Sequence, residues 1–264
     1  MTAGPASARS RSAHSTSARN LLARYGLPAT VIVLFGLLVS FTGLRETLLG
    51  AIFPRAESVL YTRVTLIAMV GQHLVLVAIS SVLATLCGVT LGIFVTRPAG
   101  RDFLNIVRDI SSLAQTFPPV AVLALAVPAL GYGFEPTIVA LFVYSILPVL
   151  NNTIAGMEGI PAELTEASRG IGMTRMQVLL LSELPLAARV IAAGVRTSVV
   201  INIGTATVGA VVGAGGLGVI IIAGLVRDNI AYVFSGAITA ALLALLVDWI
   251  FSRVETLFYS PRNR

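Results

Sequence analysis

The feature that most limits the fold of this chain is a series of long apolar segments, each close to the length that crosses a lipid bilayer. An α-helix needs about 20 apolar residues to span the hydrocarbon core. Only 11% of the 264 residues are charged, whereas charged residues make up about a quarter of a soluble domain. The sequence therefore predicts an all-α, polytopic transmembrane helix bundle of about six spans, at residues 27–44, 72–95, 113–130, 136–154, 190–212 and 230–251.

Arginine residues give the predicted bundle an orientation. They gather in regions that a six-span topology places on one side of the membrane: residues 1–25, 96–112, 156–189 and 253–264. The other side carries Arg45, Arg55, Arg63 and Arg227. Because arginine and lysine are enriched in cytoplasmic segments, we expect both termini in the cytoplasm and residues 213–229 outside. The net charge of +6 is explained by these cytoplasmic arginines. We therefore expect no nucleic-acid partner.

Differences in composition divide the chain into regions. Residues 1–25 are rich in Ser, Ala and Arg and have little apolar surface to bury, so we expect a disordered basic tail there. Residues 26–71 hold the first span and an outer connection. Residues 72–252 form the transmembrane core, and residues 253–264 form a second cytoplasmic tail.

The longest cytoplasmic connection, within residues 158–186, carries the signals of two helices joined by a glycine turn. Pro161 suits the first turn of a helix, and Gly170 or Gly172 would end that helix, because glycine adopts left-handed backbone readily. Thr174 and Gln177 form a capping box for a second helix, which we expect to end near Pro185. A simple connection needs only a few residues. The sequence therefore predicts a helix–turn–helix unit that projects from the membrane and contacts a partner.

A few residues in the spans are weaker candidates for a pore or gate, namely Phe117, Tyr144 and Arg196. A charged residue in a membrane helix is a functional candidate by default, and this applies to Arg196 and to Asp248 near the end of the last span. Arg196 is also shallow enough to snorkel to the cytoplasmic face or to pair inside the bundle. His73 is a lone histidine at the outer end of a span, and we expect a structural role for it.

The cytoplasmic connection resembles a motif of ABC importer permeases, written E-A-A, three residues, G, nine residues, I-x-L-P. Glu166, Ala167 and Ser168 open the motif, Gly172 has the required offset, and Leu184 and Pro185 close it. Two residues depart from the pattern: Ser168 replaces the second alanine, and Ser182 replaces the isoleucine. The resemblance implies that residues 158–186 form a coupling helix seated in a groove of an ATPase, with Glu166, Ala167, Ser168, Gly172, Leu184 and Pro185 at the contact.

Other segments resemble the permeases for glycine betaine, carnitine, choline and related osmoprotectants, whose fold is like that of the methionine-importer permease. The resemblance covers roughly residues 72–250, and the segments that carry it are residues 73–77, 115–118, 147–153, 204–207 and 213–218. It implies a multi-pass permease in a bacterial plasma membrane, translocating glycine betaine, choline, carnitine or proline.

The same resemblance implies partners. These are a cytoplasmic ABC ATPase dimer, which binds ATP and Mg, an extracytoplasmic solute-binding protein, and a second permease copy or a paralogue. The chain itself is then expected to hold no catalytic residue, cofactor or metal. ATP hydrolysis would belong to the partner, so we expect a transport subunit that is not an enzyme.

Other functions remain open from the sequence alone. A permease of the same fold could serve another small solute, such as an amino acid or an oxyanion. A secondary transporter would show more charged residues deep in the spans and repeated halves. An intramembrane enzyme would need a nucleophile with a base, or metal ligands, and the chain has one cysteine, Cys87, and two poorly placed histidines.

Overall fold

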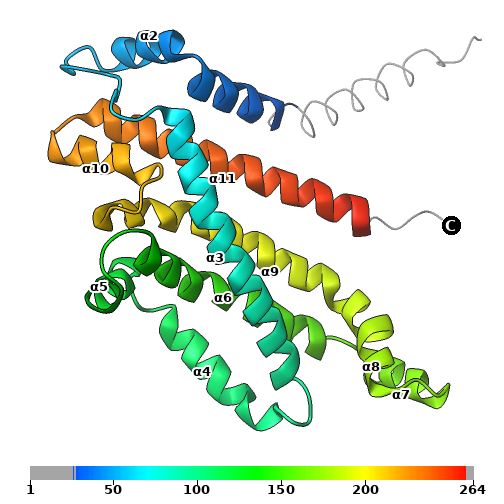
Figure 1. Ribbon diagram of the computed structural model, residues 1–264. Coiled ribbons are helices and arrows are strands. Elements are labelled where there is room, and N and C mark those ends of the chain that lie inside the picture. The colour runs from blue at the N-terminus through cyan, green and yellow to red at the C-terminus, as the bar shows by residue number, and fades with distance from the viewer. Residues whose placement is uncertain (1–25, 27, 260–264) are drawn as a thin grey trace, which may run out of the picture.

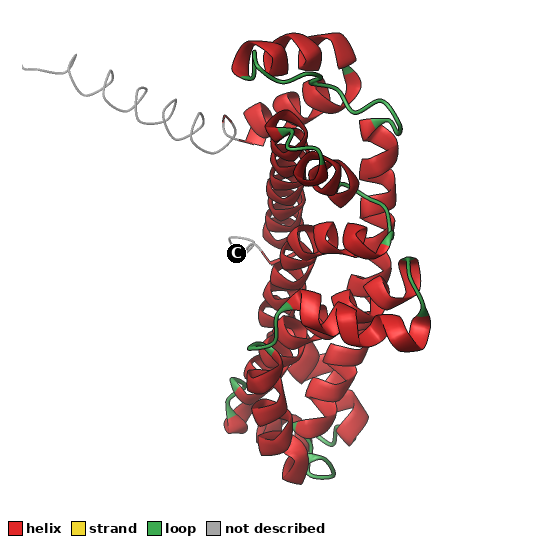
Figure 2. Cartoon of the chain, turned by 90° about the vertical axis from the view of Figure 1, so that its left-hand side faces the viewer, coloured by secondary structure: helices red, strands yellow, loops and turns green. Residues whose placement is uncertain are grey.

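A computed structural model describes residue 26 and residues 28–259 of the chain (Figure 1). Within these residues the secondary structure is helical, and no strand occurs (Figure 2). The predicted all-α class is therefore confirmed. The tail predicted at residues 1–25 lies outside the described residues.

Long apolar helices form the body of the bundle. They are α3 (Leu66–Val95), α6 (Phe134–Glu158), the stretch Arg175–Val212 that contains α9 (Leu184–Thr205), and α11 (Ile230–Tyr259). Each is long and apolar enough to cross a membrane. Counting each of two bent helix pairs as one span raises the number of candidate spans among the described residues to 6. The predicted bundle of about six spans agrees with this upper count.

The span predicted at residues 113–130 is not one straight helix. A 3₁₀ turn, η1 (Arg101–Phe103), leads into α4 (Leu104–Ala114), and α5 (Pro119–Leu130) follows at an angle of 99°. Pro118 has extended backbone, with φ −68° and ψ 140°. A residue that precedes a proline is pushed out of the helical region, so the adjacent Pro118 and Pro119 turn the chain here. The sequence prediction also missed α4, because its polar residues lower its hydropathy.

The first predicted span, residues 27–44, is likewise broken. The helix Pro28–Ser40 and α2 (Thr42–Ile52) are bent by 100°. Phe41, between them, leaves the helical backbone with φ −107° and ψ 92°. Both predicted spans therefore become bent pairs of short helices.

Helix α6 packs closely on both α3 and α9, and small residues make these contacts possible. A Cβ atom added at Gly92 of α3 would lie 2.7 Å from the side chain of Thr153 on α6. A Cβ atom added at Gly194 of α9 would lie 2.5 Å from Asn152 on α6. These two glycines therefore set how closely α3 and α9 approach α6.

A helical hairpin follows α9 at the opposite end from α7. The 3₁₀ helix η3 (Ala206–Val212) is followed by a turn, in which Gly213, Gly215 and Gly216 all have positive φ, and then by α10 (Gly218–Val226). The predicted outer connection, residues 213–229, thus contains an apolar helix. In Figure 1, α10 lies beside the start of α11, and the two elements are in contact.

The segment that follows α2 is fastened to the start of α11. The Tyr232 hydroxyl lies 2.6 Å from Ser58 Oγ and 3.1 Å from the Leu60 carbonyl oxygen. The Asn229 side chain donates a hydrogen bond to the Ser58 carbonyl at 2.8 Å. The rings of Tyr61 and Tyr232 meet edge to face. These contacts hold the first helices of the chain against the rest of the bundle.

Candidate functional site

The cytoplasmic connection predicted from the sequence forms a compact helical unit at one end of the bundle. It consists of α7 (Ala162–Gly170), α8 (Arg175–Gln177) and the π-helix η2 (Val178–Glu183). Figure 1 shows α7 and α8 beyond the ends of the long helices. The end of α11 lies on the same side, because Glu255 pairs with Arg189 near the start of α9 at 3.5 Å.

The turn between α7 and α8 follows the predicted signals. Gly172 has φ +87°, a conformation that glycine adopts at little cost. The Met173 N–H donates to the Ser168 carbonyl at 3.2 Å and closes the end of α7. Thr174 and Gln177 form the reciprocal capping box, with bonds of 2.8 and 3.3 Å. The helix–turn–helix prediction is therefore confirmed.

The second helix does not end near Pro185, as the sequence suggested. It continues through η2 into α9, and Pro185 lies in the first turn of α9. Proline has no N–H to donate, so the carbonyl of Leu181 lacks its usual α-helical partner. The wider π turns occur directly before this proline, and π-bulges are frequent at functional sites. The unit therefore continues directly into a membrane helix.

The motif residues differ in their exposure and contacts. Glu166 and Ala167 on α7 are exposed, as is Gly172, and a Cβ atom added at Gly172 would contact nothing within the chain. Ser168 Oγ donates to the Leu164 carbonyl at 2.8 Å and lies 3.0 Å from Ser182 Oγ. The two residues that depart from the family pattern thus contact each other and join α7 to η2. Leu184 is half-buried, and Pro185 is exposed.

A buried ion pair that sequence reasoning missed connects this unit to α3. Glu183, at the end of η2, is 5% exposed, and its Oε2 lies 2.5 Å from Nη2 of Arg97, just after α3. Arg97 and Glu183 are far apart in sequence, and only their charges could have suggested the pairing. The pair therefore joins the unit to α3, in addition to its continuous connection to α9.

Several apolar side chains of the unit are exposed. Ile171 is 78% exposed and Met176 is 62% exposed. Leu164, Leu180 and Leu181 are also exposed. Clustered apolar side chains on a surface mark a site of protein or membrane contact. These exposed residues make the unit a candidate docking surface, and the unit continues directly into α9.

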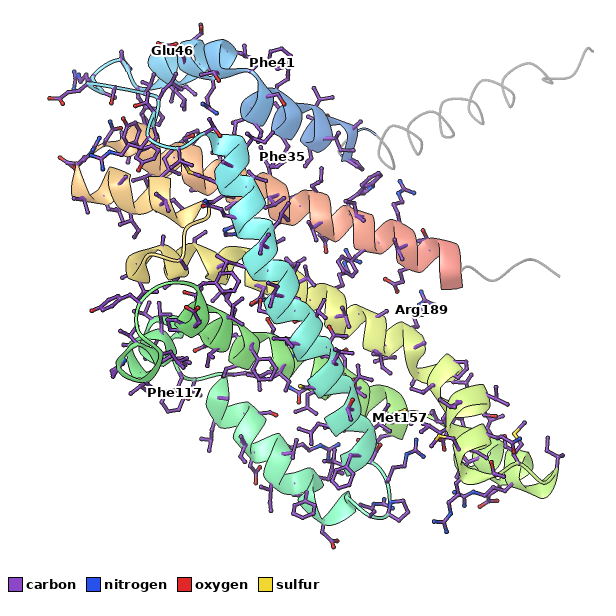
Figure 3. The ribbon with its side chains drawn as sticks, in the orientation of Figure 1. Phe35, Phe41, Glu46, Phe117, Met157 and Arg189 are labelled. Atoms are coloured by element: carbon purple, nitrogen blue, oxygen red, sulfur yellow. The ribbon has the colours of Figure 1, made fainter. Side chains whose placement is uncertain are left out.

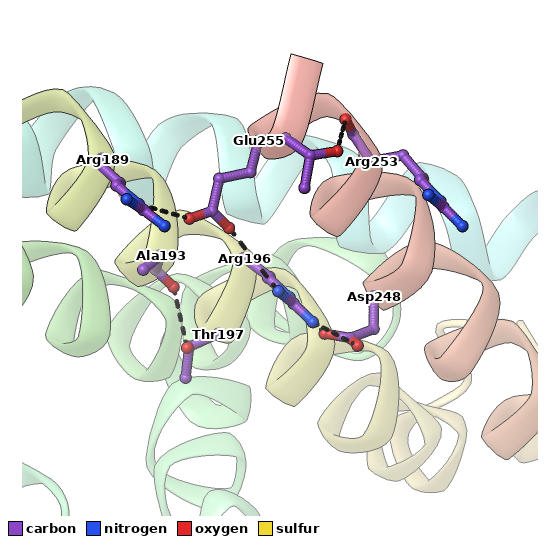
Figure 4. A network of polar contacts seen from close by, with 8 residues as sticks. Arg189, Ala193, Arg196, Thr197, Asp248, Arg253 and Glu255 are labelled. Atoms are coloured by element: carbon purple, nitrogen blue, oxygen red, sulfur yellow. Dashed lines mark hydrogen bonds and ion pairs between the residues drawn. The ribbon is translucent and has the colours of Figure 1, made fainter. Parts of the chain in front are cut away.

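Arg196, a candidate for the pore or gate, pairs with an acid on the neighbouring helix (Figure 4). Its guanidinium forms two hydrogen bonds with the Asp248 carboxylate, at 2.6 and 2.7 Å. Glu255 lies 3.8 Å from Arg196 and also pairs with Arg189. The expected pairing is therefore present between two partly exposed side chains, and it joins α9 to α11.

The other two pore candidates contact each other. The Tyr144 hydroxyl, on α6, donates to the backbone carbonyl of Phe117, in the bend between α4 and α5. The Phe117 side chain is exposed, and Figure 3 shows its position near the bend. Tyr144 therefore fixes this bend to α6, and a role in the pore stays a prediction.

His73 on α3 has the structural surroundings that the sequence suggested. It is fully buried, and its Nε2 lies 2.8 Å from the Ile203 carbonyl oxygen of α9. The Leu217 N–H donates to its Nδ1 at 3.4 Å. The neighbouring Gln72 accepts from the Gly216 N–H at 3.1 Å. These two side chains hold the glycine turn of the η3–α10 hairpin against α3.

Comparison with known proteins agrees with this geometry. Residues 88–257 match the family model described as the inner membrane component of binding-protein-dependent transport systems. The osmoprotectant import permease protein OsmY of Salmonella typhimurium is 41% identical over 73% of this chain and 81% of its own length. The choline transport system permease protein OpuBB of Bacillus subtilis is 41% identical over 70% of this chain and 84% of its own length.

The fold is similar to that of a solved ABC importer. A chain of the MetNI methionine ABC transporter, in an inward-facing conformation, superposes with a TM-score of 0.64 over 71% of this chain and 93% of that chain. The sequence identity is 24%, so this likeness concerns the fold alone. The match to the family model and the two permease relatives together confirm the resemblance expected from the motifs. The chain belongs to the family of binding-protein-dependent transport system inner membrane components, the membrane-spanning permease subunits of ABC importers.

Proposed function

We propose that this permease translocates small quaternary-ammonium osmoprotectants, such as glycine betaine, choline or carnitine, across the plasma membrane. The support for this solute class is the sequence similarity to permeases named for osmoprotectants and choline, at 41% identity. The bundle is compatible with a neutral or singly charged solute, because Arg196 and Asp248 neutralise each other. Transport needs binding weak enough to allow release.

The helical unit of α7, α8 and η2, here called the α7–α8 unit, is the proposed coupling element. Its surface is the observation that supports a role in an ATP-driven importer. Its exposed apolar residues and exposed Gly172 suit a packed groove on a cytoplasmic ATPase. Glu166, Ala167, Ser168 and Gly172 lie at or beside the contact, and Leu184 and Pro185 join the unit to α9. The ATPase dimer binds ATP and Mg and supplies the hydrolysis, so this chain acts as a transport subunit and not as an enzyme.

Closure of the ATPases would move the unit. Two contacts would make its parts and the adjoining helix move together. The Ser168–Ser182 contact joins α7 to η2, and the Arg97–Glu183 pair joins η2 to α3. Since η2 continues into α9, the movement reaches α3 and α9 together. Both of these helices pack on α6, so the transmembrane core rearranges as a whole between its inward-facing and outward-facing states.

The remaining partners follow from the same proposal. A solute-binding protein delivers the solute at the outer face, where residues 53–61 and the α10 hairpin lie. A second permease, either another copy of this chain or a paralogue, completes the pathway. The chain's termini and the α7–α8 unit then lie in the cytoplasm, as the arginine distribution predicts.

Uptake measurements test the solute class. Cells with and without the gene are supplied with labelled glycine betaine, choline, carnitine and proline, at normal and at high osmolarity. We expect uptake of at least one quaternary-ammonium compound to depend on the gene. If these four solutes are taken up equally by both strains while uptake of an amino acid other than proline or of an oxyanion is lost, the permease serves that other solute instead.

A further inference from the structure

A small cavity lies between the α7–α8 unit and the end of α3. Its volume is about 270 Å³, and its lining includes Arg97, Pro98, Arg169, Arg175, Met176 and Glu183. Arg97 and Pro98 follow α3, Arg169 ends α7, and Arg175 begins α8. The cavity is thus formed where the exposed docking surface meets the transmembrane core.

The charge of this cavity is unbalanced. Its lining holds three arginines but one carboxylate, Glu183, which is already paired with Arg97. Within the described residues, neither Arg169 nor Arg175 forms an ion pair with a carboxylate. The Arg97 side chain also has a buried nitrogen atom, Nε, without a hydrogen-bond partner among the described residues, whereas its Nη2 faces Glu183 Oε2 at 2.5 Å. The cavity is therefore suited to an anionic group that accepts hydrogen bonds.

We propose that this cavity receives an acidic side chain of the partner ATPase when the α7–α8 unit docks, an inference that rests on the proposed function. A carboxylate matches the planar fork of a guanidinium group, with two parallel hydrogen bonds. Met176 lines the cavity and is 62% exposed, and Ile171 in the adjacent turn is 78% exposed. A charged pocket beside exposed apolar residues has the anatomy of a protein interface, in which apolar contacts exclude water from the ion pair.

The exposed apolar residues and the basic cavity then have different roles in docking. The apolar residues supply buried area, whereas the cavity fixes the register of the unit on the ATPase, because an ion pair in a pocket is satisfied in one position only. Its occupant also lies beside the Arg97–Glu183 pair. The docked carboxylate therefore contacts the same arginine that connects the unit to α3.

Charge reversal tests this inference on the full chain in detergent, with the ATPase that co-purifies with the tagged wild-type chain. Arg169→Glu combined with Arg175→Glu should weaken ATPase binding at low salt by about tenfold or more, because both arginines would then repel the acidic group. Arg101→Glu is the matched control. Arg101 is exposed in η1, near the end of α3, but does not line the cavity, so this variant should bind within about twofold of the wild type. The difference between the double variant and the wild type should shrink at high salt.

The outcomes are distinguishable. If the wild-type chain retains no ATPase, the proposed function is overturned and this inference with it. If the wild type binds and the double variant binds equally well, the inference alone is wrong. Native mass spectrometry in vesicles containing phosphatidylglycerol adds a second readout. Unchanged ATPase affinity, together with loss of a bound anionic lipid in the double variant, would assign the cavity to a lipid headgroup and overturn the inference.

Discussion

At the residue scale, His73 shows how polar groups are accommodated inside the apolar bundle. Both ring nitrogens have partners on other elements, the Ile203 carbonyl and the Leu217 N–H. Since Nδ1 accepts from Leu217, Nε2 carries the proton and donates to Ile203. Ile203 lies close to the point where α9 tightens into the 3₁₀ helix η3. The histidine thus joins α3, the end of α9 and the η3–α10 hairpin at a site that water does not reach.

Replacing His73 by leucine should destabilise the permease. The substitution keeps a similar volume but leaves the Ile203 carbonyl and the Leu217 N–H without partners. An unsatisfied buried group costs about 1–3 kcal/mol, so we expect a loss of about 2–4 kcal/mol. The thermal unfolding midpoint in detergent should fall by roughly 5–10 °C. His73→Gln, which keeps a donor and an acceptor, should recover part of this loss.

A neighbouring position on the same helix provides the control. Leu74 is 39% exposed, so Leu74→Ala should change the midpoint by much less than His73→Leu. If His73→Leu and Leu74→Ala unfold at the same temperature as the wild type, the two hydrogen bonds of His73 contribute nothing to stability.

At the scale of single elements, the sequence predicted the α7–α8 unit well and the bent pairs poorly. Short-range signals, such as the Thr174–Gln177 capping box, determine local structure and can be read directly. The 99° bend after α4 depends on contacts with other elements, including the bond from Tyr144 to the Phe117 carbonyl. The Arg97–Glu183 pair likewise forms only after α3 and η2 have come together. Such long-range contacts leave no periodic pattern in the sequence.

Substitutions at Gly172 separate backbone strain from contact with a partner. A Cβ atom at this position would meet nothing within the chain, although φ is +87°. Asparagine tolerates positive φ better than other non-glycine residues, so Gly172→Asn should retain most activity. Gly172→Trp adds bulk on the exposed surface and should abolish ATPase stimulation by loaded binding protein. The assay is ATP hydrolysis and solute uptake in a reconstituted complex.

The two Gly172 variants must be compared for folding as well as for activity. Both should insert into the membrane and unfold at similar temperatures, because the turn is exposed and lies outside the transmembrane core. Equal stimulation by Gly172→Trp and Gly172→Asn would show that the turn does not enter a packed groove. The coupling assignment of Gly172 would then be wrong.

At the scale of the whole molecule, apolar length was enough to predict the class and most of the long helices. The expected spans at residues 136–154 and 230–251 lie within α6 and α11, which extend further at their ends. The sequence prediction missed two helices outside the long spans, α4 and α10. In α4, polar residues hid the helix from a search for apolar runs, whereas the apolar α10 lies within residues 213–229, which were predicted to be an outer connection. The basic cavity was missed because its arginines come from separate segments.

The orientation of the molecule is the last prediction, and it depends on the two ends of the bundle. Arg175 in α8 and Arg227 after α10 are both exposed and belong to opposite ends of α9 and its extension, Arg175–Val212. A stretch of 38 residues is long enough to cross the hydrocarbon core and to project beyond it. The arginine distribution predicts that the Arg175 end lies in the cytoplasm. Single cysteines at Arg175 and Arg227 should therefore react from opposite sides, with a membrane-impermeant maleimide reaching only position 227 from outside intact cells.

The native Cys87 is exposed on α3 and must first be replaced by serine. Labelling of position 175 from outside would reverse the topology, and it would remove the α7–α8 unit from the compartment in which the ATPase works.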